Sequence, residues 1–406
     1  MDWQTTPEDS VPSTLVPGSA ALGGSIGMLG KPPVTGAWRP GDDPGDRRFV
    51  GVGAVEVRGG LLPDVRVAYE TWGVLDEDRS NAVLVLHALT GDSHVTGAAG
   101  PGHRTAGWWT DIVGPGRAID TDRWFVIAPA MLGGCQGTTG PSSLAESGAE
   151  WGSRFPFVTV RDQVAVVARL ADTLGIGRFA AAVGGSMGGM HALELAVTHP
   201  ERVERLAVLS APAQTTADQI AANSLQRSAI EMDPGFAGGD YYDQEPGEGP
   251  HRGLALARRM ALLTYRAPDE LNSRFARSWQ SDVSPLGDDG RFSVESYLDF
   301  HGNKFTRRFD ANSYRTLLSA MDSHDIGFGR GGVERALSRV TARTLVVGIA
   351  SDRLFPLEDQ DRIAAGTPQT LDGDRATLID SPYGHDGFLI EHEAVGAHLR
   401  RLLEDA

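Results

Sequence analysis

One segment constrains the fold of this chain more than any other, because in it a lone serine stands between glycines where a strand-like run meets a helical one. The residues GGSMGG, 184–189, follow the apolar run 178–183 and precede the helical pattern 190–197. Glycines two positions either side of Ser186 let strand and helix approach closely, and the strained turn raises the hydroxyl above the sheet edge. The start of the helix favours negative charge there. This pattern is typical of a nucleophile elbow, although a chain with 51 glycines also forms plain strand-to-helix turns of similar sequence.

Further along the chain lie the two partners that such a serine needs. In an α/β-hydrolase fold the nucleophile, the acid and the histidine follow one another in sequence, and each stands just after a strand. Asp352 follows a β-branched apolar run, and His385 lies in a tight loop after a second short run. We therefore predict Asp352 as the acid and His385 as the base, with Asp359 and Asp361 as the nearby alternatives for the acid.

An oxyanion hole is also predicted. Residues 82–87 form an apolar run typical of a central parallel strand, and the loop after it supplies one backbone N–H, here that of Leu89. The second N–H belongs to Met187, the residue after the nucleophile. His87, at the mouth of the same strand, is interpreted as a structural neighbour of the site and not as a catalyst.

Alternating strands and helices predict a mostly parallel central sheet flanked by helices, the α/β-hydrolase fold. The predicted strands are 65–70, 82–87, 124–128, 179–183, 203–210, 344–349 and 376–379. Between 210 and 325 no strand is predicted, and the helical patterns there are 217–232, 253–265, 268–279, 293–307 and 312–324. The expected organisation is a flexible tail (1–45), a first part of the core (46–210), an inserted helical lid (211–325) and a second part of the core (326–406).

Composition excludes several classes of function. A net charge of −16 argues against nucleic acid as a partner. The single cysteine, Cys135, excludes an intrachain disulfide and a multi-cysteine metal cluster, and it fits a reducing cytoplasm. Cys135 has no elbow around it, so we do not expect it to be a nucleophile. The Pro- and Gly-rich start of the chain predicts neither a signal peptide nor a membrane anchor, and no run approaches the roughly 18 apolar residues of a spanning helix.

One arginine of the predicted lid is oddly placed. Arg258 lies at four-residue spacing between Leu254 and Leu262, inside the apolar stripe of its helix. A guanidinium there needs an anionic partner, either an acid of the core or the carboxylate of a substrate. By contrast, Arg252, Arg259 and Arg266 recur every seven residues and are interpreted as one solvated basic face.

At this point the chain resembles a known family, the homoserine O-acetyltransferases of the α/β-hydrolase superfamily, from about Tyr69 onward. The resemblance rests on the motifs HALTG at 87–91, GTTGPSS at 137–143, GGSMGGM at 184–190, GGDYY at 238–242, LTY at 263–265, FDANSY at 309–314 and YGHD at 383–386. The long N-terminal tail departs from the family pattern. The resemblance implies the Ser186, Asp352, His385 triad and a helical lid that forms a homodimer interface.

The resemblance also implies a reaction. Acetyl would pass from acetyl-CoA as co-substrate to the hydroxyl of L-homoserine through an acyl-Ser186 intermediate, a step of methionine biosynthesis, without a metal or a prosthetic group. Arg258 and Asp386 would bind the amino acid, a zwitterion that needs both a cation and an anion. A succinyl donor or a serine acceptor within the same family, a serine esterase and a non-catalytic protein on this scaffold remain the alternatives.

Overall fold

The computed structural model describes residues 30–287 and 289–404. Its centre is an eight-stranded sheet with the order β1-β4-β8-β5-β9-β10-β11-β12. The strands are β1 (Arg48–Gly51), β4 (Arg66–Trp72), β5 (Ala82–Leu86), β8 (Phe125–Pro129), β9 (Ala181–Gly185), β10 (Arg205–Leu209), β11 (Arg343–Ile349) and β12 (Thr377–Ile379). From β8 to β12 every neighbouring pair is parallel, whereas β4 is antiparallel to both β1 and β8. The predicted α/β-hydrolase fold is confirmed.

Apolar side chains on both faces of this sheet form two layers of core. The central strand β5 is buried throughout, as a parallel strand covered on both faces must be. On one face pack α2 (Val160–Thr173), α3 (Met187–Thr198) and α10 (Leu357–Gly366), and on the other α12 (His392–Glu404). The parallel strands therefore end at one common edge, which is where the predicted site residues stand.

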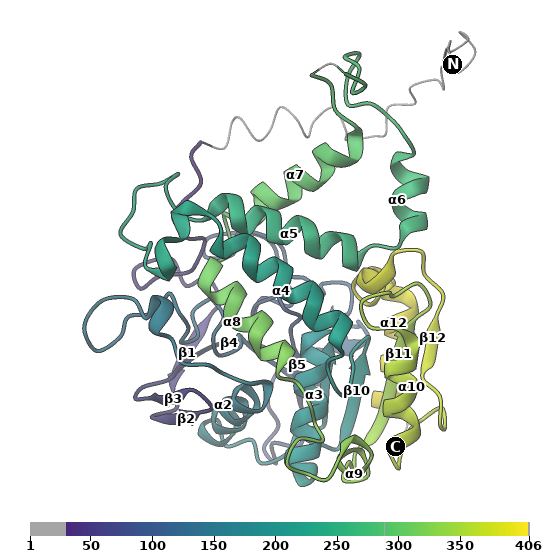
Figure 1. Ribbon diagram of the computed structural model, residues 1–406. Coiled ribbons are helices and arrows are strands. Elements are labelled where there is room, and N and C mark those ends of the chain that lie inside the picture. The colour runs from purple at the N-terminus through teal and green to yellow at the C-terminus, as the bar shows by residue number, and fades with distance from the viewer. Residues whose placement is uncertain (1–29, 288, 405–406) are drawn as a thin grey trace.

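The segment between β10 and β11 consists of helices in the described residues. The helices are α4 (Ala217–Glu231), α5 (His251–Tyr265), α6 (Pro268–Phe275), α7 (Ser293–Phe305), α8 (Ala311–Asp322) and the short α9 (Val333–Leu337). Figure 1 shows α4 and α5 lying across the carboxyl edge of the sheet, with α6 and α7 farther out. No helix that the structure describes is both long and apolar enough to cross a membrane.

Residues 30–45 contradict the expectation of a flexible tail over 1–45. They lie on the protein as an N-terminal strap: the Gly36 N–H donates to the Phe309 carbonyl and the Trp38 N–H to the Cys135 carbonyl. Ala37 is buried. The strap has few large apolar side chains, but its backbone is held by hydrogen bonds to residues far along the chain, which composition does not reveal. Residues 1–29 of the expected tail lie outside the described part.

A buried carboxylate ties this strap to the lid and accounts for two of the motifs. Asp310 accepts hydrogen bonds from the hydroxyls of Tyr241, Tyr242 and Thr35, and it caps α8 through the Ser313 N–H. The motifs GGDYY and FDANSY thus meet at the carboxylate of Asp310, both of whose oxygens accept hydrogen bonds. Their role in this structure is to fix the lid, not to line the reacting centre.

Sequence patterns missed the edge strand of the central sheet and two separate two-stranded sheets. The edge strand β1 and the hairpin of β2 (Val55–Val57) and β3 (Gly60–Leu62) were not predicted, nor was the pair of β6 (Val113–Gly114) and β7 (Ile119–Asp120). These strands have two to four residues, too few for an alternating pattern to stand out.

Candidate active site

Three side chains from distant parts of the chain form one hydrogen-bonded line at the edge of the sheet. Ser186 follows β9, Asp352 follows β11 and His385 follows β12. The His385 Nε2 lies 2.8 Å from the Ser186 Oγ, and its Nδ1 lies 2.7 Å from the Asp352 Oδ2. This is the geometry of a nucleophile, a base and the acid that orients the base.

The turn at Ser186 is strained in the way that the glycine pattern predicts. Ser186 has φ 57° and ψ −127°, a conformation that residues with a Cβ rarely adopt. A Cβ on Gly184 would lie 2.1 Å from the Gly188 carbonyl oxygen, and one on Gly188 would lie 2.1 Å from the Leu86 carbonyl oxygen. Larger residues at either position would push strand and helix apart, so these glycines are required for the turn.

Of the three candidate acids, only Asp352 contacts His385. Its second oxygen, Oδ1, accepts the N–H groups of Leu354 and Phe355, so the carboxylate is held in place from both sides. Asp359 instead accepts a hydrogen bond from Gln219, and its pKa is raised by burial and by the neighbouring charge of Asp352. Asp361 pairs with an exposed arginine, Arg375, at 2.7 Å.

His385 is enclosed by aromatic rings. Tyr265, Phe355 and Phe388 lie 5.8, 5.1 and 5.5 Å from it, measured between ring centres. Burial alone lowers the pKa of His385, but the charge of Asp352 and the hydrogen bond to it act in the opposite direction, and the net pKa is raised above its ordinary value. His385 is thereby a stronger base than a free imidazole.

Two backbone N–H groups are free where an oxyanion hole was predicted. Among the described residues, neither Leu89 N–H nor Met187 N–H donates a hydrogen bond to a protein group. Met187 is the first residue of α3, directly after Ser186, and Leu89 lines a cavity together with Tyr265 and Phe355, both of which contact His385. Free, buried donors beside the nucleophile are what an oxyanion requires.

Arg258 lies near this centre without an acidic partner. Its guanidinium stands 5.5 Å from the ring centre of Tyr265 and 5.2 Å from that of Phe305, and its buried Nη1 has no hydrogen-bond acceptor among the described residues. No described carboxylate lies within 4.0 Å of it. The alternative that Arg258 pairs with an acid of the core is therefore wrong for this structure, and its charge is available to a ligand.

Asp386 has a protein partner that the sequence did not reveal. Its Oδ2 lies 3.2 Å from the Nε of Arg266, whose side chain is only 16% exposed. The interpretation of Arg266 as part of a solvated face is thus wrong. That interpretation assumed that the helix continues through Arg266 with a seven-residue period. However, α5 ends at Tyr265 and Arg266 has an extended backbone, so its side chain does not lie on the helix face that Arg252 and Arg259 share. Arg259 does lie nearer the surface and pairs with Asp299 at 2.7 Å.

The two residues that were not expected to be catalytic are buried in structural roles. His87 accepts the Met131 N–H at its Nε2 and so donates from its Nδ1 to the Ala88 carbonyl. Burial raises the pKa of the Cys135 thiol to about 12, which keeps it protonated and unreactive.

A buried cluster of polar side chains beneath the oxyanion loop was not predicted from the sequence. Glu70 accepts hydrogen bonds from Ser93 and from His94 Nδ1, and its carboxylate lies 3.6 Å from His103 Nε2. In the described part of the chain Glu70, His94 and His103 are the group whose ligand atoms lie close enough together to be considered for a metal ion. However, the two imidazoles are stacked with their planes only 11° apart, so no single point lies in both ring planes at bonding distance. The cluster fits a hydrogen-bonded brace for residues 88–95 better than a metal site.

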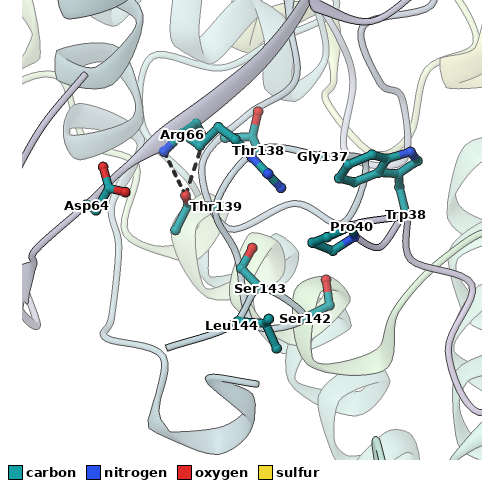
Figure 2. Close-up of a pocket in the computed structure, with 10 residues that line it drawn as sticks. All are labelled: Trp38, Pro40, Asp64, Arg66, Gly137, Thr138, Thr139, Ser142, Ser143 and Leu144. Atoms are coloured by element: carbon teal, nitrogen blue, oxygen red, sulfur yellow. Dashed lines mark hydrogen bonds between the residues drawn. The ribbon is translucent and has the colours of Figure 1, made fainter. Parts of the chain in front are cut away.

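A polar pocket of about 250 Å³ lies apart from these residues (Figure 2). Arg66 stands over the rings of Trp38 and Phe49, and its backbone N–H donates to the Thr139 hydroxyl. Thr138 makes the equivalent bond to Ala68. The motif GTTGPSS therefore fastens a loop to β4, and none of the predicted site residues lines this pocket.

Comparisons with known proteins agree with this arrangement. The model of a family described as the alpha/beta hydrolase fold matches residues 81–391. A protein of Leifsonia xyli subsp. xyli named homoserine O-acetyltransferase is 65% identical, over 99% of each chain. The crystal structure of homoserine O-acetyltransferase from Bacillus anthracis superimposes with a TM-score of 0.80 at 26% identity, covering 88% of this chain and 97% of that one. Esterase E22 superimposes with a TM-score of 0.79 at 27% identity, covering 88% of this chain and 99% of that one. The chain belongs to the homoserine O-acetyltransferase family of α/β-hydrolase-fold proteins.

Proposed function

We propose that this protein is a homoserine O-acetyltransferase, which transfers acetyl from acetyl-CoA to the side-chain hydroxyl of L-homoserine and releases O-acetyl-L-homoserine and CoA. The observation that carries the proposal is the guanidinium of Arg258, which has no acidic partner and stands over Tyr265, the ring that also lies against His385. An amino-acid acceptor supplies a carboxylate that can pair with this cation, whereas the uncharged ester substrate of an esterase supplies none. The product belongs to methionine biosynthesis, and the enzyme would work in the cytoplasm, where acetyl-CoA is present.

In the first half of the reaction His385 Nε2 takes the proton of the Ser186 hydroxyl as Oγ attacks the thioester carbonyl. The N–H groups of Leu89 and Met187 would stabilise the tetrahedral oxyanion. When the carbon–sulfur bond breaks, His385 returns the proton to the sulfur, so that CoA leaves as a thiol and Ser186 carries the acetyl group. Asp352 stabilises the charged imidazole in each of these steps.

In the second half homoserine replaces CoA. Arg258 would bind its α-carboxylate, and Asp386 its α-ammonium, although Asp386 must then be shared with Arg266. His385 removes the proton of the homoserine hydroxyl, whose oxygen attacks the acetyl ester. The collapse of the second tetrahedral intermediate breaks the bond to Oγ, and His385 returns the proton to Ser186. These steps need only the chain's own residues.

Transfer must compete with hydrolysis, because the fold is shared with esterases such as E22. Ser186 and His385 are 5% and 3% exposed in the structure. Limited access for water favours an acceptor that is held in place over one that diffuses in. This supports transfer, and the same triad without acceptor binding would give hydrolysis.

The proposal is tested by an assay of two donors, acetyl-CoA and succinyl-CoA, against two acceptors, homoserine and serine. We expect the highest kcat/KM for acetyl-CoA with homoserine, and release of free acetate that is slow in comparison. A preference for succinyl-CoA or serine would change the substrate assignment within the family. Acetate release that homoserine does not suppress would instead identify an esterase.

A pair of adjacent arginines tests the acceptor site. Arg258→Lys keeps the charge but loses the two-pronged hydrogen bonding of a guanidinium, and we expect it to lower the use of homoserine by roughly 10-fold to 100-fold, about 1.4 to 3 kcal/mol. The measurement is loss of the acetyl group from pre-acetylated enzyme as homoserine is increased. Acetylation by acetyl-CoA should change little.

The matched control for this measurement is Arg259→Lys. Arg259 follows Arg258 on the same helix and pairs with Asp299 at a partly exposed site. Such a pair contributes little, so we expect less than about a twofold change. Equal defects in both variants, or a defect confined to acetylation, would remove Arg258 from the acceptor site.

We also propose that the protein is a homodimer that pairs through its lid. Leu225 on α4 and Met232, the C-cap residue directly after α4, are exposed, and so are Leu256 and Leu263 on α5. Each pair is seven residues apart, so each forms an apolar stripe on one face of its helix. Stripes of this kind are typical of surfaces that another protein covers. Light scattering should give twice the chain mass, and a monomer would contradict the proposal.

A further inference from the structure

Basic side chains gather around His301 in the outer lid. They are Arg258 on α5, Arg266 at its end, Arg274 on α6 and Lys304 on α7, and we call these four residues the basic rim. Burial first, and then the charges of all four, lower the pKa of His301 to about 4. His301 is therefore neutral, and the rim surrounds it with positive charge.

Ring contacts show how the rim is held together. The guanidinium of Arg274 stands 4.7 Å from the ring centre of Tyr297, and Tyr297 lies 4.5 Å from His301, measured between ring centres. Arg258 stands 5.2 Å from the ring centre of Phe305 on the same helix, α7. The cations of α5 and α6 are thus fixed against one face of α7 by aromatic side chains.

The rim holds more positive than negative charge. Among the described residues two carboxylates pair with it, Asp386 and Glu270. Arg258 and Lys304 form no ion pair there. In a chain whose net charge is −16, an uncompensated group of cations beside the active site is unexpected on composition alone. It would attract and hold an anion.

Polar atoms of this region also lack partners. The buried atoms Arg258 Nη1 and Tyr297 Oη form no hydrogen bond among the described residues. Tyr297 is 2% exposed, so its hydroxyl is removed from solvent at a cost that a bond would normally offset. Buried donors without partners in this region of the lid favour a polar ligand there.

The rim extends outward from the reacting centre. At its inner end Arg266 contacts Asp386, the residue after His385. From there α6 leads away from the sheet, as Figure 1 shows. Arg274 lies in its last turn, roughly 9 Å farther along the helix axis from the first residue of α6. Arg274 and Lys304 are exposed, so a ligand can reach them from solvent.

We propose that the outer rim, Arg274 and Lys304, binds the phosphate groups of the CoA donor. This inference rests on the proposed function, because it assigns a site for the part of acetyl-CoA that does not react. The pantetheine arm separates the thioester from the phosphates, so these groups must bind away from Ser186 and toward solvent. The phosphates carry several negative charges, and arginine and lysine are the side chains that bind them best. Arg258, at the inner end of the rim, is left for the acceptor.

Two thioester donors distinguish an effect on phosphate binding from an effect on the acyl-transfer step. Acetyl-pantetheine has the same reacting end as acetyl-CoA but lacks the nucleotide and its phosphates. Arg274→Gln and Lys304→Gln should each lower kcat/KM for acetyl-CoA by about fivefold to tenfold, with acetyl-pantetheine changed by less than about twofold. Adenosine 3′,5′-bisphosphate should compete with acetyl-CoA in the unmodified protein and compete less well in both variants.

Arg252→Gln is the matched control, since Arg252 is an exposed arginine in the first turn of α5 and no described carboxylate pairs with it. It should leave both thioesters unaffected. Equal losses with both thioesters, no loss with acetyl-CoA, or an equal loss in Arg252→Gln would each overturn the assignment. A protein that neither thioester acetylates would overturn the proposed function itself, and the inference with it, since no acyl donor would then need the rim.

Discussion

Ser186→Ala is expected to abolish the acetyl-enzyme and to lower turnover by roughly 10⁴-fold to 10⁶-fold. The Ser186 hydroxyl lies 2.8 Å from His385 Nε2, and alanine has no oxygen at that position to carry the acetyl group. Mixing the unmodified protein with acetyl-CoA alone should release about one CoA per chain and add one acetyl group to the peptide that contains Ser186. Intact-mass and peptide mass spectrometry measure both results.

Ser210→Ala is a demanding control for that experiment. Ser210 directly follows the neighbouring strand β10, is buried and has φ 46°, and its hydroxyl has no hydrogen-bond partner among the described residues. It therefore shares the backbone strain and burial of Ser186 but does not contact His385. We expect it to keep most of its activity. Near-native turnover in Ser186→Ala, or initial-rate lines that intersect as for a ternary complex, would disprove the covalent mechanism.

Asp352→Asn should fold normally and lose roughly 10⁴-fold in turnover. Its Oδ1 already accepts two backbone N–H groups, from Leu354 and Phe355, so the asparagine oxygen takes that position. The amide nitrogen then faces His385 Nδ1 and donates to it. This forces the proton onto Nε2, where the imidazole can no longer accept the proton of Ser186.

The pH profile distinguishes this explanation from general damage. His385 must be neutral to act as a base, so acylation falls as pH drops through its pKa, which the charge of Asp352 holds above the ordinary value against the effect of burial. In Asp352→Asn burial acts without that charge, so the acid limb of the remaining activity should move to lower pH. Asp359→Asn is the control, and a severe loss there with a mild one at Asp352 would show that the acid is misassigned.

Much of the site was predictable because its signals are local or follow chain order. The glycines around Ser186 are required by contacts of 2.1 Å that any Cβ would make, and such spacing is visible in the sequence. Asp352 and His385 could be predicted as the acid and the base because each follows a strand that is recognisable in the sequence as an apolar run. The central parallel strands could be predicted because a strand buried on both faces of the sheet is a continuous apolar segment in the sequence. The short outer strands and residues 30–45 carry no such pattern.

What the sequence by itself determined, then, is the fold class, the elbow and the order of the residues around it, because periodicity and glycine spacing are properties of neighbouring residues. Only the tertiary structure decided which groups meet. It placed His385 against a serine 199 positions away, joined Arg266 to Asp386 beyond the end of a helix, and left Arg258 without an acid. Pairing of charges and burial of polar atoms depend on contacts between distant segments, and a one-dimensional pattern does not contain those distances.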